Sequence, residues 1–129
     1  MPFDSVTMNI DQLYGQYWFH DGAIKSFHLD IQNNRIEVEL FVKRIRNRPP
    51  GPLREKELEP CTLQLIFEEL IEVSLFDRFP TQGYYLNFST FNNSSNGIEV
   101  SFNVHDSSNS VYEKDNWVIK ARQIAWKEV

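Results

Sequence analysis

The strongest constraint on the fold is an alternating pattern of apolar and polar residues on both sides of Asn33-Asn34, in the stretch FHLDIQNNRIEVEL. Apolar residues recur at every second position, which is the period of a half-buried β-strand. Asparagine tolerates positive φ, so the two asparagines suit a two-residue turn. The sequence therefore predicts an antiparallel hairpin. Folding at this turn aligns three apolar pairs on one face, Ile31 with Ile36, Leu29 with Val38 and Phe27 with Leu40.

The same register gathers polar side chains on the other face of the hairpin. It sets His28 opposite Glu39 and Asp30 opposite Glu37. Directly opposed carboxylates are mildly unfavourable unless a neighbouring cation or a partner compensates them. We interpret His28, Asp30, Glu37 and Glu39 either as ordinary solvated strand residues or as a binding surface for a protein with a basic surface.

Shorter signals along the chain complete the expected architecture. Residues 7–17 carry a helix signal with Asn9 as the N-cap. The proline-rich span 47–60 indicates a long loop. Residues 61–76 fit two strand segments with a break near Glu68-Glu69, and they fit a helical stripe as well. The β-branched residues and the neighbouring strands favour the strand interpretation of this segment.

A second hairpin is expected in the C-terminal half. Tyr84, Leu86 and Phe88 alternate inward, the polar segment 92–97 turns the chain, and residues 98–104 alternate again. A last strand is expected over residues 117–126. The sequence therefore predicts one domain over residues 1–129 that is mainly β, with an antiparallel sheet in a sandwich or open barrel beside one short N-terminal helix.

Length and composition narrow the classes of function. A chain of 129 residues is large enough for one hydrophobic core, and no segment approaches the roughly 20 apolar residues of a membrane helix. No secretory signal is visible at the start, so we expect a cytoplasmic protein with no membrane partner. With Cys61 as its single cysteine, the chain forms neither an intramolecular disulfide nor a multi-cysteine metal site.

The net charge of −5 is unevenly distributed along the chain. Residues 43–56 contain six basic side chains and one glutamate, a net charge of +5, which leaves −10 for the remainder. Such a body is a poor binder of nucleic acid, because phosphate binding needs a broad positive face. It suits a basic protein partner, since opposite charges accelerate encounter. We interpret the basic segment itself as a solvated connector.

The stretch YWFHDGAI at residues 17–24 holds the most reactive-looking side chains. Asp21-Gly22 is typical of a turn into the first strand, in which the aspartate bonds to backbone N–H groups and His20 closes over it or over an aromatic ring. We therefore interpret Trp18, Phe19, His20, Asp21 and Gly22 as a structural motif. The aromatic side chains of Tyr14, Tyr17, Trp18 and Phe19 either plug the end of the sheet or form an exposed recognition patch.

An enzymatic alternative depends on the three histidines. If the strands carrying His28 and His105 were adjacent, His20, His28 and His105 would form a metal site for hydrolysis. Against this, a strand from His20 to His28 would separate them by over roughly 20 Å. Cys61 is typical of a buried, inert thiol, and no serine lies in a G-x-S-x-G motif. We expect no catalytic residue, metal or cofactor; a barrel holding a small apolar ligand is a third hypothesis.

The order of these motifs resembles that of a family of small bacterial proteins. Phe19-His20-Asp21-Gly22 is similar to an F-H-D-A-like opening, HLDIQNNRIEVEL follows as a hairpin, and LQLIFEELIEV follows as a later strand. In these features the first half of the chain looks like the Immunity protein 50 type of polymorphic toxin systems, with Gly22 in place of the more usual alanine. The resemblance implies a non-enzymatic protein that binds and silences a toxin. The prediction is a protein-binding domain.

Overall fold

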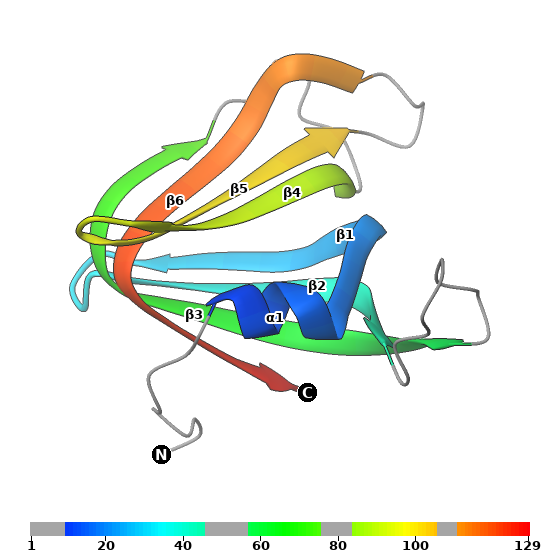
Figure 1. Ribbon diagram of the computed structural model, residues 1–129. Helices are drawn as coiled ribbons and strands as arrows, with labels where there is room; N and C mark the ends of the chain where they lie inside the picture. The colour runs from blue at the N-terminus through cyan, green and yellow to red at the C-terminus, as the bar shows by residue number, and fades with distance from the viewer. Residues whose placement is uncertain (1–9, 46–56, 76–83, 106–110) are drawn as a thin grey trace.

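The computed structural model describes residues 10–45, 57–75, 84–105 and 111–129 (Figure 1). Within these residues, one short helix is followed by six strands whose pairings are all antiparallel. The elements are α1 (Ile10–Gln16), β1 (Tyr17–Asp30), β2 (Arg35–Ile45), β3 (Leu58–Leu75), β4 (Tyr84–Ser94), β5 (Gly97–His105) and β6 (Val111–Glu128). The predicted mainly β fold with one short N-terminal helix is confirmed.

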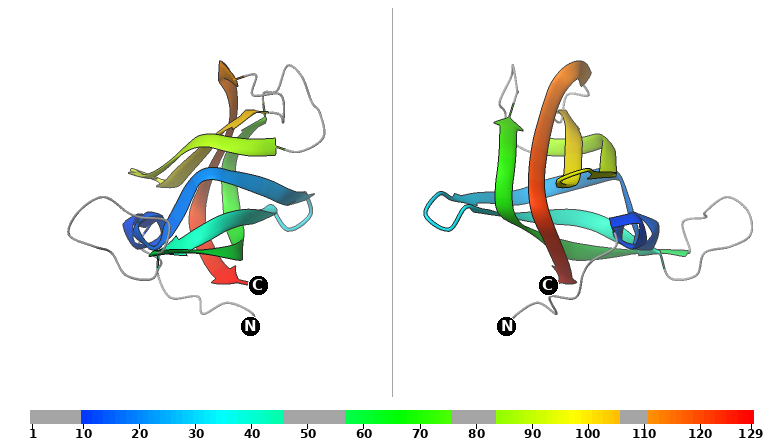
Figure 2. Two further views of the ribbon diagram at one scale, coloured as in Figure 1. Left: turned by 90° about the vertical axis from the view of Figure 1, so that its right-hand side faces the viewer. Right: turned by 60° about the vertical axis from the view of Figure 1, so that its left-hand side comes forward.

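The strands are arranged as two antiparallel meanders, β1-β2-β3 and β4-β5-β6, that join to close a barrel in the order β1-β2-β3-β6-β5-β4. Figures 1 and 2 show β3 and β6 running side by side along the whole height of the curled sheet. Their register extends from Leu63 opposite Glu128 to Leu75 opposite Trp117. This long ladder is the main connection between the two meanders.

The opposite junction, between β1 and β4, is short. It pairs only Ala23 with Tyr85 and Ile24 with Tyr84. The sheet is therefore a half-barrel that one brief seam closes, and of the two predicted architectures, sandwich and open barrel, the barrel is the one observed. The seam is the weakest boundary of the sheet because it has the fewest strand pairs to hold it.

The hydrophobic core fills the interior of the barrel and reaches under α1. Alternate strand residues point inward, as the period of two requires, and Ile36, Val38 and Leu40 on β2 are fully buried in this way. Ile10 and Leu13 lie three residues apart on α1, hence on one face of the helix, and both are fully buried. The helix predicted over residues 7–17 is thus confirmed for 10–16. Its proposed cap, Asn9, lies outside the described residues.

The first hairpin forms as predicted, but its register is shifted by two residues. Leu29 pairs with Ile36 and Phe27 pairs with Val38. A shift of two keeps each residue on its predicted face, because side chains alternate with a period of two. The predicted partner of Ile36 was Ile31, which instead lies in the turn and is 81% exposed. The predicted pairing was therefore wrong. The inward assignment is right for Phe27 and for Ile36, Val38 and Leu40 on β2, but wrong for Leu29 and Ile31, which are exposed.

Side-chain hydrogen bonds explain why the turn is longer than two residues. The carboxylate of Asp30 accepts hydrogen bonds from the backbone N and the Nδ2 of Asn33, at 3.2 and 2.7 Å. Asn34 adopts a positive φ of 52°, and its Nδ2 donates to the backbone oxygen of Leu70 at 3.2 Å. These contacts enclose the residues from Ile31 to Asn34 in one turn and fix the register of β1 on β2.

Residues 61–75 belong to a single long strand, so the helical alternative for this segment is wrong. The break expected near Glu68-Glu69 is present, because Glu69 has a φ of 55° and the register with β6 shifts between Leu70 and Glu72. The loop predicted over 47–60 is wrong at its end, since Leu58 to Pro60 already pair with β2. The four basic residues between 46 and 56 lie outside the described residues.

The second hairpin is confirmed, with longer strands and a tighter turn than expected. β4 continues to Ser94 and β5 begins at Gly97, so the turn is Ser95-Asn96 rather than the whole segment 92–97. Gly97 has a φ of 151°, and a Cβ there would collide with the backbone oxygen of Ala121 on β6. This close approach requires glycine, so the tip of the hairpin can pack directly on its neighbour. The last strand, predicted over 117–126, extends from Val111 to Glu128.

A register shift in β4 changes which of its residues face the core. The shift lies between Leu86 and Phe88, and beyond it Ser89 pairs with Phe102 and Phe91 pairs with Val100. Ser89 and Phe91 are consequently buried on the core side, whereas strict alternation from Leu86 would have turned them outward. The register shift therefore places the Ser89 hydroxyl group beside the apolar side chains by which β4 faces the core.

Candidate functional site

The motif Phe19-His20-Asp21-Gly22 forms a wide bulge inside β1. Trp18 pairs with Lys43 and Ala23 pairs with Phe41, so the whole tetrapeptide lies opposite the single residue between those partners. The prediction of a turn that precedes the first strand was wrong in position, since β1 begins at Tyr17. Asp21 adopts the positive φ of 64° that tight turns use, and the contact of its carboxylate is with His20. The chain loops out and rejoins the same strand pair.

Gly22 allows this bulge to press against the neighbouring strand. A Cβ at this position would collide with the backbone oxygen of Phe41 and lie 3.0 Å from the backbone oxygen of Phe19. Both obstacles are main-chain atoms that cannot rotate away. An alanine at this position would therefore require a different bulge geometry.

His20 and Asp21 form an exposed pair on the outside of the bulge. The Nδ1 atom of His20 lies 3.1 Å from Oδ2 of Asp21, and the Asp21 side chain is 80% exposed. The His20 ring also lies edge-on to Trp18, with 6.3 Å between the ring centroids. His20 thus makes both of the contacts expected for it, with the carboxylate and with an aromatic ring. In water such an exposed pair contributes little to stability.

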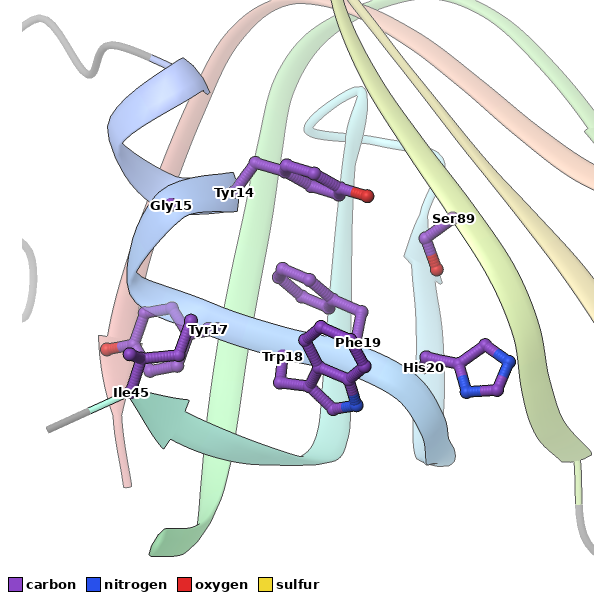
Figure 3. Close-up of a pocket in the computed structure, with 8 residues that line it drawn as sticks. All are labelled: Tyr14, Gly15, Tyr17, Trp18, Phe19, His20, Ile45 and Ser89. Atoms are coloured by element: carbon purple, nitrogen blue, oxygen red, sulfur yellow. The ribbon is translucent and has the colours of Figure 1, made fainter. Parts of the chain in front are cut away.

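A pocket of about 630 Å³ opens beside this bulge, between α1, β1 and β4. Figure 3 shows its lining, with Tyr14 on the helix side, Trp18 and His20 on β1 and Ser89 on β4. It lies on the side of the short seam where β1 and β4 no longer pair. The described lining residues are Tyr14, Gly15, Tyr17, Trp18, Phe19, His20, Ile45 and Ser89.

The aromatic segment serves both as core and as surface. Tyr17 and Phe19 are buried, whereas Tyr14 and Trp18 are exposed at the pocket. The Tyr14 and Phe19 rings stack nearly parallel, with centroids 6.0 Å apart, and Phe91 packs on Phe19 at 4.6 Å. The two interpretations left open by the sequence therefore apply to different residues of the same stretch.

A second, smaller hollow of about 170 Å³ lies on the other side of Trp18. Trp18 and His20 line both hollows, so their side chains form the ridge between them. Phe41 and Lys43 line this second hollow from β2. The two aromatic residues at its rim, Trp18 and Phe41, are 40% and 49% exposed. Large aromatic side chains at the edge of a hollow are typical anchors of binding surfaces.

Ser89 was missed by the sequence interpretation. It is 8% exposed, and its Oγ has no hydrogen-bond partner within the described part of the chain. Alternation from Tyr84 and Leu86 predicts that it faces outward, and only the register shift in β4 turns it inward. The shift has neither glycine nor proline to mark it, so no signal in the sequence could have found this residue.

A polar cluster at the start of β1 ties the C-terminal strand to the barrel. The Tyr17 hydroxyl donates to Oε2 of Glu128 at 3.0 Å, and Nη2 of Arg44 lies 2.6 Å from Oε1 of the same carboxylate. Burial and the hydrogen bond to Glu128 raise the pKa of Tyr17 above its ordinary value. Burial and the nearby Glu128 charge also raise the pKa of the Cys61 thiol, so the neutral thiol is favoured as expected.

The carboxylates of the first hairpin are separately paired rather than opposed. Asp30 lies opposite Arg35, not opposite Glu37, and His28 lies opposite Glu37. The predicted repulsion between Asp30 and Glu37 is therefore wrong. Glu37 contacts Arg35 at 2.5 Å. Hydrogen bonds from the side chain and backbone of Asn33 lower the pKa of Asp30 below its ordinary value.

Glu39 completes the outer face of the hairpin. It contacts Lys25 at 3.9 Å, and the Lys25 Nζ lies 5.2 Å from the centre of the Phe41 ring. On β2 the residues Glu37, Glu39 and Phe41 alternate with buried Val38 and Leu40, so the acidic and aromatic side chains share one outer face. The alternation in the sequence predicted the acidic cluster but not that Phe41 continues it along the same face.

The strands that carry His28 and His105 are not adjacent, because β4 lies between β1 and β5. The adjacency on which the alternative metal site depends is therefore absent. Within the described ranges, no three His, Cys, Asp or Glu side chains are grouped closely enough to hold a metal ion. Of His105, only the backbone pairing with Tyr85 and Val111 is described.

Comparison with known proteins gives no match for this chain, whether among family models, curated proteins or solved structures. The resemblance to the Immunity protein 50 type stays a prediction. Among the described residues, no helix combines the length and the apolar character needed to cross a membrane.

Substituting Gly22 with alanine tests the packing of the bulge. We expect Gly22→Ala to lower the free energy of unfolding by roughly 2 kcal/mol, because the new Cβ meets main-chain oxygens. Gly15→Ala is the matched control, since a Cβ there meets nothing within 4 Å and alanine stabilises a helix by about 0.5–1 kcal/mol. Urea unfolding measures the free energy of unfolding of both variants. A Gly22→Ala protein as stable as the wild type would contradict the described bulge.

Three substitutions at Asp21 separate its backbone conformation from its carboxylate. We expect Asp21→Ala to lose ~1 kcal/mol, a few degrees of melting temperature, because alanine tolerates a φ of 64° less well. Asp21→Gly and Asp21→Asn should keep the wild-type stability, since both residues accept this conformation. Thermal unfolding of the wild type and the three variants gives the melting temperatures that test this expectation. An equal loss in all three variants would show that the carboxylate contact with His20 is the stabilising part.

The buried Tyr17 and the half-buried thiol of Cys61 predict a loss of stability in alkaline solution. Tyr17 and Cys61 both have folded pKa values above the ordinary ones of about 10 and 8.5. The unfolded chain therefore loses these protons first, and the free energy of unfolding should fall as the pH rises above about 8.5. Urea unfolding between neutral and strongly alkaline pH measures this. A Tyr17→Phe/Cys61→Ala double variant should show a shallower fall, and an unchanged slope would refute the assignment.

Proposed function

We propose that this chain is a non-enzymatic protein-binding domain whose partner has a basic surface. The single observation that carries the proposal is the pair of exposed aromatic side chains Trp18 and Phe41 on either side of a surface hollow. Burying two such rings on association gives large contact area at a low cost in side-chain entropy. The acidic hairpin residues lie on the same outer face of β2 as Phe41.

The contact surface of the proposal therefore extends along the outer face of β1 and β2. It combines an aromatic centre with a charged border, which is the usual arrangement of a protein interface. The members of this surface are Trp18, Phe41, His28, Asp30, Glu37 and Glu39, with Lys25 between the aromatic and the acidic part. We name it the hairpin face.

The ion pairs of the hairpin face are compatible with a basic partner. The Arg35–Glu37 and Lys25–Glu39 pairs are each partly exposed, and exposed pairs contribute only about 0–1 kcal/mol. A partner's arginine or lysine can replace the internal cation at little cost. The net charge of −5 on the whole chain adds long-range attraction to such a partner.

The resemblance to the Immunity protein 50 type supports a particular kind of partner. It implies that the partner is a toxin encoded next to this chain. A toxin that acts on nucleic acid has a basic groove, to which the hairpin face would be complementary in charge. The proposal of toxin neutralisation depends on this resemblance, whereas the proposal of protein binding depends on the exposed aromatic pair.

Expression of the adjacent reading frame tests the immunity proposal. We expect its product to be toxic to a bacterial host alone and tolerated when this chain is co-expressed, with a stoichiometric complex on gel filtration. A harmless product that forms no complex with this chain would remove the immunity proposal.

Substitutions on the hairpin face test the contact surface with that product. We expect Phe41→Ala to weaken binding roughly 30-fold, the loss of about 2 kcal/mol that is typical of an aromatic anchor. Ile71→Ala is the control, because Ile71 is 47% exposed and lies on β3. Glu37→Lys with Glu39→Lys should slow association at low salt, and the effect should shrink as salt is added. Wild-type binding by all these variants would exclude the hairpin face.

A further inference from the structure

We propose that the pocket between α1, β1 and β4 binds a small neutral molecule with an aromatic body and one hydrogen-bonding group that meets the Ser89 hydroxyl. The site is separate from the hairpin face, although Trp18 borders both. Its volume of about 630 Å³ lies in the range of ligand pockets, and at about 30 Å³ per water it corresponds to roughly 20 water molecules. The mouth of a β-barrel is a common place for such a site.

Ser89 is the observation that points to a ligand. Its side chain is more than nine-tenths buried, and its Oγ has no hydrogen-bond partner among the described residues. Figure 3 shows it directed from β4 into the space between Tyr14 and His20. A buried hydroxyl without a partner costs free energy, so the free protein would be more stable with an alanine here. A ligand that hydrogen-bonds to Oγ removes this cost.

The walls of the pocket determine the class of ligand. Four of the eight described lining residues, Tyr14, Tyr17, Trp18 and Phe19, are aromatic, and such side chains pack best against flat rings. None of the described lining residues is Asp, Glu, Lys or Arg. A charged group would therefore meet no fixed counter-charge among these described residues, which favours a neutral ligand. The ligand is neutral where it lies in the pocket.

The fold keeps this pocket open instead of filling it. The seam between β1 and β4 pairs only at Ala23 and Ile24, and the bulge at residues 19–22 directs β1 away from β4 beyond that point. The register shift in β4 turns Ser89 toward the resulting space. Two irregularities, one on each strand, thus form opposite walls of one pocket.

Binding of N-phenyl-1-naphthylamine tests the proposal directly. This neutral dye has an aromatic body and one N–H donor, and it fluoresces when apolar surroundings exclude water. We expect saturable binding with one molecule per chain and a shift of the Trp18 indole N–H resonance in NMR spectra. Ser89→Ala should weaken binding three- to tenfold, the effect of losing one neutral hydrogen bond. The same variant should melt at or above the wild-type temperature.

Two controls make the result specific. Thr90→Ala changes the next residue, whose exposed hydroxyl contacts Ser101 outside the pocket, and should leave dye binding unchanged. 1-Anilinonaphthalene-8-sulfonate has the same aromatic body with an added anionic group and should bind more weakly than the neutral dye. No dye binding, equal binding by wild type and Ser89→Ala, or preference for the sulfonate would each overturn the proposal. A failure of these tests leaves the hairpin face to be judged by Phe41→Ala, since Phe41 is not among the described residues that line this pocket.

Discussion

The structure depends on the long antiparallel ladder between β3 and β6. It is the main join between two three-stranded meanders, neither of which encloses a core alone. Along this ladder the inward residues of both strands, such as Leu65 and Ile119, are fully buried in the common interior. Burial of these side chains is the principal driving force that holds the meanders together. The remaining strands extend from both sides of this ladder, and the barrel closes where β1 meets β4.

Closure at the far side is incomplete, and this incompleteness gives the molecule its surface features. β1 and β4 meet over a brief seam, so the aromatic side chains of α1 and of the bulge line the remaining gap. These rings present large apolar area on rigid frames to the pocket that remains. They also leave Tyr14 and Trp18 partly in solvent. The pocket that we propose for ligand binding is a consequence of where the sheet fails to close.

The sequence predicted the strands well because apolar and polar residues alternate wherever one face of a sheet is buried. It assigned the correct faces to Phe27, Val38 and Leu40, and it located the irregularity at Glu68-Glu69. The register of the first hairpin was wrong, because the turn length depends on side-chain hydrogen bonds from Asn33 to Asp30. Alternation alone cannot distinguish two registers that differ by two residues.

The candidate sites were harder to predict than the fold. Asp21-Gly22 indicated a left-handed position, but nothing local shows whether the chain turns away or loops back into the same strand. Ser89 gave no signal, since the register shift in β4 depends on packing against β5. The hairpin face joined Phe41 to the acidic residues only once the register was known. Sites of this kind depend on irregularities, which is where sequence rules fail first.

Trp18 connects the two proposed binding events. Its side chain borders both the pocket of α1, β1 and β4 and the hollow beside Phe41. The orientation that best closes over a ligand in the pocket need not be the one that best receives a partner on the hairpin face. By linkage, a ligand that changes the affinity for the partner must have its own affinity changed by the same factor. The exposed indole of Trp18 is therefore the side chain that the two sites share.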